Sequence, residues 1–423
     1  MIAIILIALM FFFLVLIFPM IVAMVASPLV ILYFYMTNMD MLMASQQLIA
    51  GVSSTVLLSV PMFILAADIM CAGQTTKRLL DLVQTFVGHI SGGMAITTAA
   101  ACTIFGAISG STQATVVAIG KPTRGRLSEL GYNDGASTAL IISSAIIALL
   151  IPPSISMIMY AVVTGSSVGD LFIAGVGPGI FMFICFAIYS FFYAKKVNIP
   201  KLKKATWAER GVALKKAILP LGFPVIIFAG IYSGIFSPTE SAAIAVLYAL
   251  ILELIIYRSI KITDLYRISL STAVVTCAVF VLVAGGQLFS WVISYAQIPQ
   301  MITAIVLGSD PSALRILVTV TVFFFVGCMF VDSLVVIIII SPIFFAPAMA
   351  AGIDPIHLGI VITLQAAIGS ISPPFGCNIF TACAIFNKPY VTVVRGLPPY
   401  IIMCILITAV VILCPQLSLF LLG

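Results

Sequence analysis

A stretch of this chain occurs twice, and the two copies lie a constant 221 residues apart. The first copy spans residues 131–154 and the second spans residues 352–375. In each, an apolar run ends at a Pro-Pro pair 21 residues after the first glycine. The same offset carries residues 111–112 onto residues 332–333. A fixed offset over this length predicts two structural repeats, each with a polar tip followed by a helix that is broken at the Pro-Pro pair.

The chain is far more apolar than a water-soluble domain. It is 63% hydrophobic and 8% charged, whereas soluble domains are about one quarter charged. Apolar stretches long enough to span a bilayer recur as far as Leu422, and no charged residue precedes Asp40. These runs are continuous, whereas a membrane β-barrel would show alternating segments of about ten residues. The sequence therefore predicts an all-α polytopic membrane protein embedded in a lipid bilayer.

The charged residues indicate topology. Residues 195–217 hold eight lysines and arginines against the single acid Glu209, so the positive-inside rule makes this loop cytoplasmic. The net charge of +6 comes from such loops and gives no sign of a nucleic-acid partner. Counting spans from this loop places the first hairpin on the inside and the second on the outside, which predicts inverted repeats. The nine cysteines lie in apolar stretches without a CxxC pair, so we expect buried thiols.

The order of segments predicts four parts. They are N-terminal scaffold helices at 1–44, repeat 1 at 45–194, a basic loop with central scaffold helices at 195–267, and repeat 2 at 268–423. The elements expected within them are two helices separated at Pro19, a span at 47–72, an interfacial helix at 74–90, a hairpin at 91–120, a broken helix at 134–164, spans at 171–194, 218–236 and 239–257, a second hairpin at 312–350, a second broken helix through Pro373-Pro374, and a last span at 397–422.

The hairpin of repeat 1 is predicted from a polar interruption. Five small or polar residues, Ser109–Gln113, lie in the middle of an apolar stretch. A re-entrant hairpin would place them as a tip at the membrane midplane, where irregular backbone is tolerated only if it is buried in protein or lines a cavity. The alternative is one ordinary helix whose serines bond back to their own turn. The counterpart at 331–333 favours the hairpin.

Each Pro-Pro pair predicts a group of free carbonyl oxygens. Proline has no N–H, so it frees the helical carbonyl four residues earlier. Pro152 and Pro153 would free the carbonyls of Ala148 and Leu149, and the second pair would free those of Gly369 and Ser370. Such carbonyls at the end of a half-helix suit Na⁺, while the half-helices that restart near Ser154 and Phe375 point N–H groups at an anion. The alternative is that the prolines only kink the helices for packing.

These arguments define two sets of candidate residues. The predicted sodium ligands are Ser109, Gly110, Ser111, Ala148, Leu149, Phe330, Asp332, Ser333, Gly369 and Ser370. The predicted substrate-binding residues are Ser111, Thr112, Ser154, Asp332 and Asn378, and the broken-helix prolines are Pro152, Pro153, Pro373 and Pro374. An acid at a mid-membrane tip is costly, so Asp332 is expected to serve the ion site. Its alternative role is to cap the helix that follows. Na⁺ is the only metal expected, and no other cofactor is implied.

Several motifs together resemble a known family, the large membrane subunit of tripartite ATP-independent periplasmic (TRAP) transporters. They are Ser109–Ser111, Gly131–Tyr132, Ile151–Ser154, Leu171–Gly179, Ser237–Glu240 and Ile353–Gly359. The resemblance implies a Na⁺-driven importer of organic acids in the bacterial inner membrane, with an elevator mechanism. It also implies two partners, a small four-helix membrane subunit and a periplasmic substrate-binding protein. Gln113 and Thr115 stand where the family often has an acid, and overall similarity leans to the sialic-acid branch over C4-dicarboxylates.

Two other functions are considered. A stand-alone Na⁺/carboxylate symporter with the same repeats would need no binding protein. An intramembrane enzyme is disfavoured: Gly165–Gly169 matches the G-x-S-x-G nucleophile pattern, but the only histidines, His89 and His357, lie in other segments.

Overall fold

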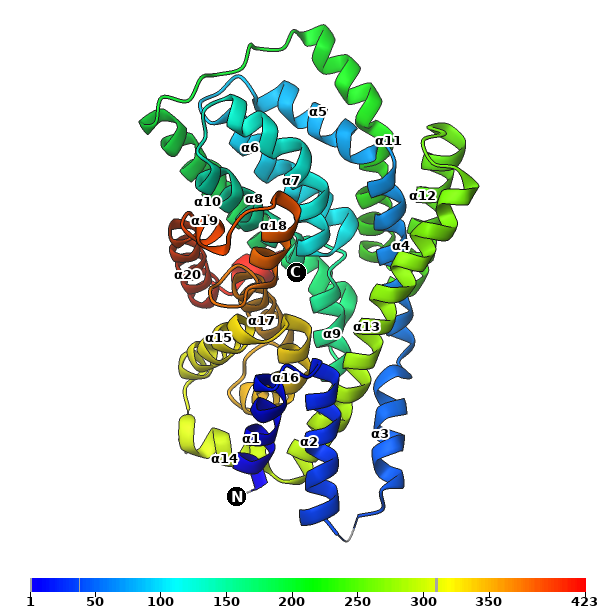
Figure 1. Cartoon of the computed structure of the whole chain (residues 1–423), viewed down its shortest axis with the longest axis vertical. Helices are drawn as coiled ribbons and strands as arrows, with labels where there is room; N and C mark the ends of the chain where they lie inside the picture. Colours follow the sequence, from blue (N-terminus) through cyan, green and yellow to red (C-terminus); the bar gives the residue numbers. More distant parts are fainter. Residues whose placement is uncertain (1, 38, 309–310) are drawn as a thin grey trace.

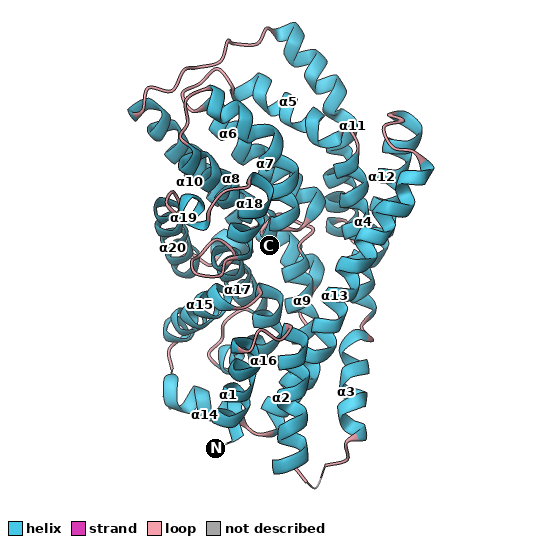
Figure 2. Ribbon diagram, viewed as in Figure 1, coloured by secondary structure: helices cyan, strands magenta, loops and turns pink. Residues whose placement is uncertain are grey.

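The computed structural model describes residues 2–37, 39–308 and 311–423, so residues 1, 38, 309 and 310 lie outside this description. Helices joined by loops make up the described chain (Figure 2). As far as the basic loop the elements are α1 (Ile2–Val15), α2 (Met20–Tyr35), α3 (Leu42–Val52), η1 (Thr55–Leu58), α4 (Ser59–Ala72), α5 (Thr75–Val87), α6 (Gly93–Ser109), α7 (Thr112–Glu129), α8 (Asp134–Ala145), η2 (Ile146–Leu149), α9 (Ile155–Thr164) and α10 (Val168–Lys196).

The elements after the basic loop follow the same pattern of long and short helices. They are α11 (Trp207–Tyr232), α12 (Pro238–Leu250), η3 (Ile251–Ile256), α13 (Ile262–Tyr295), α14 (Ile298–Val306), α15 (Ala313–Phe330), α16 (Ser333–Ala350), α17 (Pro355–Gly369), α18 (Cys377–Phe386), α19 (Tyr390–Val394), α20 (Pro398–Leu413) and α21 (Gln416–Leu419). Within the described ranges, seven helical segments are long and apolar enough to cross a bilayer. Large apolar side chains on their outer faces, such as Val225 and Val274, are exposed, as expected where lipid replaces water.

The helices pack in two groups. In the first, α12 packs against α4, and the 34-residue α13 packs against α2, α3 and α4. Figure 1 shows α3, α4, α12 and α13 along one side of the molecule. The second group contains the paired helices α6–α7 and α15–α16 and the interrupted helices α8–α9 and α17–α18, together with α10 and α20. α11 packs against α12 of the first group, and the amphipathic α5 contacts both α11 and α6, so it connects the two groups.

Both predicted hairpins and both predicted helix breaks are present, although the first hairpin, predicted at 91–120, continues to Glu129. The chain separates α6 from α7 at residues 110–111 and α15 from α16 at residues 331–332. The first interrupted helix is irregular at residues 150–154, and the second at residues 370–376. The predicted helices on either side of Pro19 and the helix near 74–90 are also confirmed.

Other boundaries were wrong. The span predicted at 47–72 is two elements, because Ser53 and Ser54 interrupt it and the Ser53 hydroxyl donates to the Ile49 carbonyl. The basic loop is irregular only at 197–206, since Thr206 and Glu209 form a capping box that starts α11 within it. The last span ends at Leu413. The division into four parts stays a prediction, and its boundaries at 44/45 and 267/268 fall inside α3 and α13.

Candidate ion and substrate site

The tip of the first hairpin packs directly on the first break. Gly110 has φ +59° and caps α6 by donating its N–H to the Gly106 carbonyl. A Cβ at Gly110 would clash with the carbonyl oxygen of Pro153, and one at Gly106 would lie 2.5 Å from the Cα of Ala148. Only glycine allows this approach, so the sequence places two glycines where the hairpin meets the broken helix.

The hydroxyls of this tip form a small network. Ser109 Oγ and Thr115 Oγ1 share a hydrogen bond of 3.0 Å, and Thr115 Oγ1 donates to the Ser111 carbonyl at 2.8 Å. Ser111 Oγ accepts the N–H of Ala114 and so caps α7. The predicted residues 109–111 therefore lie together, and Thr115 joins them. The sequence analysis noted Thr115 only as a departure from the family pattern.

The first break leaves several oxygens without hydrogen bonds. The N–H groups of Leu150 and Ile151 both donate to the Ile147 carbonyl, and the next two residues are prolines. Within the described chain, the carbonyls of Ala148 and Leu149 accept no hydrogen bond, as the prolines predict. The hydroxyls of Ser143 and Ser144, less than two turns earlier on α8, are fully buried and also have no partner there. The sequence analysis missed these two serines, because serine in an apolar helix is ordinary.

The second tip and the second break are also in contact. A Cβ at Gly369 would clash with Cys328, in the last turn of α15. The N–H of Phe375 donates to the Met329 carbonyl at 3.1 Å, so the break is bonded directly to the hairpin. Asp332 is exposed, and its carboxylate accepts the N–H of Leu334 at 2.9 Å. Asp332 therefore caps α16, the alternative role considered from the sequence.

The expectation of free carbonyls at the second break was wrong. The Gly369 carbonyl accepts the N–H of Ser372 at 3.0 Å, and the Ser370 carbonyl accepts the N–H of Asn378 at 3.0 Å. The reason is the path of the chain after Gly369, which turns back so that Ser372 and Asn378, the second residue of α18, supply the donors that the prolines remove. Each carbonyl keeps a second lone pair for a cation, but neither is unpaired.

The candidate substrate residues do not form one exposed pocket. Ser154 is fully buried and caps α9 through the N–H of Met157, and Thr112 is buried beside the first tip. Asn378 is fully buried too, and its side-chain amide donates to the Ser370 hydroxyl at 3.2 Å. Ser111, Thr112 and Ser154 thus gather at the first break, whereas Asp332 and Asn378 belong to the second.

A line of aromatic rings runs outward from the second break. The centroids of Phe330 and Phe375 are 6.1 Å apart, those of Phe375 and Phe380 are 6.4 Å apart, and those of Phe380 and Tyr390 are 5.9 Å apart. Phe330, Phe375 and Phe380 are each about half exposed. The Tyr390 hydroxyl donates to the Pro374 carbonyl at 2.9 Å. The sequence analysis named Phe330 only for its backbone and missed this aromatic line.

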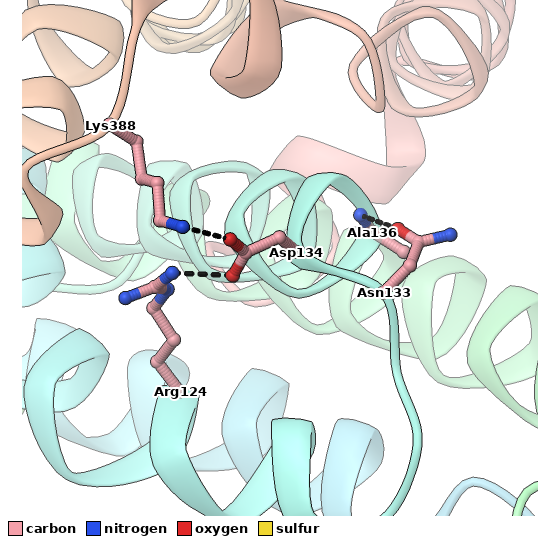
Figure 3. A network of polar contacts seen from close by, with 5 residues as sticks. All are labelled: Arg124, Asn133, Asp134, Ala136 and Lys388. Carbon is pink, nitrogen blue, oxygen red and sulfur yellow. Dashed lines mark hydrogen bonds and ion pairs between the residues drawn. The ribbon is translucent and has the colours of Figure 1, made fainter.

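The two segments predicted to be repeats are bonded to each other. At the start of α8, Asp134 pairs with Arg124 of α7 and with Lys388, from the loop between α18 and α19 (Figure 3). The packing is reciprocal as well, because α18 lies against α7 of the first hairpin and α9 lies against α16 of the second. The second half of each broken helix thus supports the hairpin of the other repeat.

This fold defines a class of protein, a multi-span helical membrane protein. Comparison with known proteins gives the family. The model of the DctM component of tripartite ATP-independent periplasmic transporters matches residues 7–417. The chain belongs to this family of TRAP transporter large permeases.

Three curated relatives show where in the family the chain lies. It is 56% identical to the Halomonas elongata "Ectoine TRAP transporter large permease protein TeaC" over 377 residues, which cover 89% of the chain and 88% of the relative. It is 51% identical to the Ruegeria pomeroyi "Ectoine/5-hydroxyectoine TRAP transporter large permease protein UehC", with the same coverage. It is only 33% identical to the Vibrio cholerae "Sialic acid TRAP transporter large permease protein SiaM", again with the same coverage. The similarity therefore does not favour the sialic-acid branch.

A solved structure shares the fold. The Alcanivorax borkumensis YdaH transporter superposes with a TM-score of 0.55 at 16% identity, covering 88% of this chain and 87% of that one. The protein is thus an all-helical multi-span membrane permease of a bacterial TRAP system, and not an enzyme.

Proposed function

We propose that this chain is the large permease subunit of a Na⁺-driven importer of ectoine and related zwitterions. It would work with a small four-helix membrane subunit and a periplasmic substrate-binding protein in the bacterial inner membrane. The substrate assignment rests on sequence identity. The chain is 56% and 51% identical to two ectoine permeases, against 33% to a sialic-acid permease. Ectoine replaces the sialic acid or C4-dicarboxylate expected from the sequence.

The first break supports the sodium site. The carbonyls of Ala148 and Leu149 and the hydroxyls of Ser143 and Ser144 are unsatisfied oxygens close together along the chain. Oxygen atoms are the ligands that hard cations prefer, and the C-terminal end of a half-helix adds partial negative charge. The tip at 109–111 would complete this site. A second site would use 330–333 with Gly369 and Ser370, whose carbonyls would offer their remaining lone pairs.

The proposed mechanism is an elevator with two inverted repeats. The constant offset of 221 residues and the reciprocal packing of α9 on α16 and α18 on α7 support the repeats. The two packing groups support a division into a fixed scaffold and a moving body. The sequence placed residues from 268 onward in repeat 2, but most of the contacts of α13 are with α2, α3 and α4, although it also packs against α16. We therefore propose that α13 belongs to the scaffold.

The chemistry of the substrate suits the second break. Ectoine combines a carboxylate with a ring in which the positive charge is delocalised over an amidinium group. The exposed faces of Phe330, Phe375 and Phe380 would attract such a flat cation. The carboxylate would face the N-terminus of the half-helix α18.

The test is uptake by reconstituted protein. Liposomes would carry this chain and its small subunit, with the cognate binding protein outside, and labelled ectoine, sialic acid and succinate would be offered with and without an inward Na⁺ gradient. We expect ectoine uptake that needs both the gradient and the binding protein. Uptake of sialic acid or succinate in place of ectoine would refute the assignment of ectoine as the substrate. Robust uptake by this chain without any binding protein would favour the stand-alone symporter.

A further inference from the structure

A cavity lies apart from the two breaks, where both repeats meet near the end of α10. Its volume is about 600 Å³, and it is lined by α8, α10 and the segment from α19 to α20. Four tyrosines contribute to its wall, which are Tyr132, Tyr189, Tyr193 and Tyr400. We call it the tyrosine cavity. Nothing in the proposed transport cycle uses it.

The tyrosine cavity offers a hydrogen-bond donor that has no acceptor. The hydroxyl of Tyr132, a residue 6% exposed, has no hydrogen-bond partner within the described ranges, whereas the hydroxyl of Ser190 lies beside that of Tyr400. Buried hydroxyls are normally paired, so an unpaired one that lines a cavity indicates a ligand or bound water. The rings are fixed, since Tyr132 stacks on Tyr193 and Tyr189 packs edge-on against Tyr400. The hydroxyls are therefore presented by a rigid wall.

The tyrosine cavity is also positively charged. Arg395 lines it and forms no ion pair with any described residue, whereas nearby Lys388 and Arg124 are held by Asp134. No aspartate or glutamate is among the described lining residues. The 12-residue helix α8 begins here, so the positive end of its dipole lies at the wall, beside Gly135. The Tyr132 hydroxyl, the guanidinium of Arg395 and a helix N-terminus together favour an anion.

The location narrows the kind of anion. Three residues after Tyr193, α10 ends at Lys196, and the lysine-rich loop follows, so the tyrosine cavity lies at the cytoplasmic edge of the membrane by the positive-inside rule. Tyrosine is enriched at this level, and the inner leaflet carries anionic phospholipids. The cavity is much larger than a carboxylate needs, and part of its wall is apolar, with Leu140 and Pro399.

We propose that the tyrosine cavity binds a phosphate-bearing anion through Arg395 and the Tyr132 hydroxyl. Its source is the headgroup of an anionic phospholipid or a soluble phosphate ester, since both offer the same chemistry. A ligand bound here joins α8 and α10 of the first repeat to α20 of the second. It therefore fastens the two repeats together at one end of the proposed moving body.

The experiment measures binding to the purified full-length chain. Native mass spectrometry would count retained molecules while the chain is titrated with phosphatidylglycerol, phosphatidylcholine or glycerol 3-phosphate. We expect Arg395→Gln to weaken binding about ten-fold, as for a lost charge-assisted hydrogen bond, and Tyr132→Phe to weaken it about three-fold while keeping the ring stack. The matched controls are Arg267→Gln and Tyr266→Phe, both exposed on α13, which should bind as the unaltered chain does.

Each outcome has one meaning. Binding of phosphatidylglycerol over phosphatidylcholine with this pattern of variants supports the lipid source. Binding of glycerol 3-phosphate alone, with the same pattern, supports the soluble source. If none of the probes binds, or if the cavity variants bind like the controls while their melting temperatures are unchanged, the tyrosine cavity holds only water and the proposal is overturned.

Discussion

At the first break, the carbonyls of Ala148 and Leu149 accept no hydrogen bond from the described chain, whereas at the second the equivalent carbonyls of Gly369 and Ser370 are both bonded. The same Pro-Pro pair stands at both places. The difference arises because the chain turns back at the second break, so that Ser372 and Asn378 supply N–H donors, whereas no described residue does so at the first break. A proline removes one donor, but the path of the loop decides whether the carbonyl stays free. The first break is therefore the stronger candidate for binding Na⁺.

The largest expected effect comes from disrupting the close contact between the tip of the first hairpin and the first break. Gly110→Leu would place a side chain against the Pro153 carbonyl and would strain a residue with φ +59°. Together these should cost about 3 kcal/mol and abolish ectoine uptake. Gly131→Leu is the control for backbone strain, since its φ is +90° and a Cβ there meets nothing within 4 Å. If both variants lose the same activity, strain alone explains the effect and the contact does not matter.

The two prolines should differ in their effect on Na⁺. Pro152→Ala returns an N–H that can bond the Ala148 carbonyl, so we expect the Na⁺ concentration for half-maximal uptake to rise about ten-fold, as for one lost ligand. Pro373→Ala returns a donor to a carbonyl that Ser372 already occupies, so its effect should be at most about three-fold. Equal effects would mean that the hydrogen bonds of the second break open when Na⁺ binds.

Variants of the two buried serines of α8 should change Na⁺ binding without lowering the stability of the protein. Ser143→Ala or Ser144→Ala removes a buried hydroxyl without a partner, so the protein free of Na⁺ should be as stable as before or about 1 kcal/mol more stable. The Na⁺ concentration for half-maximal uptake should nevertheless rise about five-fold, if the hydroxyl is a ligand. Thr363→Val on α17 is the matched control, because its hydroxyl donates to the Gly359 carbonyl. Unchanged Na⁺ dependence in both serine variants would remove these hydroxyls from the site.

The contrast between the two breaks also shows which features of the site can be predicted from the sequence. The hairpins, the breaks and the glycines at the contacts were predictable, because polar tips, prolines and a repeated offset act locally on the backbone. The occupancy of the Gly369 carbonyl was not, since it depends on the path of 371–376 in space. The role of Ser143 and Ser144 was hidden for a similar reason. A serine in an apolar helix normally bonds back to its own turn, and only the folded chain reveals that these do not.

The aromatic line gives the second break a role of its own. Phe375→Leu keeps apolar volume but removes the face that would attract the delocalised cation of ectoine, so we expect the KM for ectoine to rise about three- to five-fold, as for an exposed cation–π contact. The Na⁺ dependence should not change. Phe192→Leu, on the exposed face of α10, is the control. A KM unaffected by Phe375→Leu would assign these rings to packing against lipid or another subunit.

The smallest expected effect tests how much the hydrogen bond from Tyr390 to the Pro374 carbonyl stabilises the second break. Tyr390 donates to the Pro374 carbonyl at 2.9 Å, whereas the residue at the same offset in the first repeat is Gly169, which has no such donor. Tyr390→Phe therefore makes the second break resemble the first by freeing one carbonyl. Losing a single neutral hydrogen bond should lower the free energy of unfolding by about 1 kcal/mol. The Na⁺ concentration for half-maximal uptake should stay within about two-fold, because the Gly369 and Ser370 carbonyls keep their own donors. A clear gain in apparent Na⁺ affinity would instead show that hydrogen bonding at this break limits ion binding, and the two breaks would then differ in degree and not in kind.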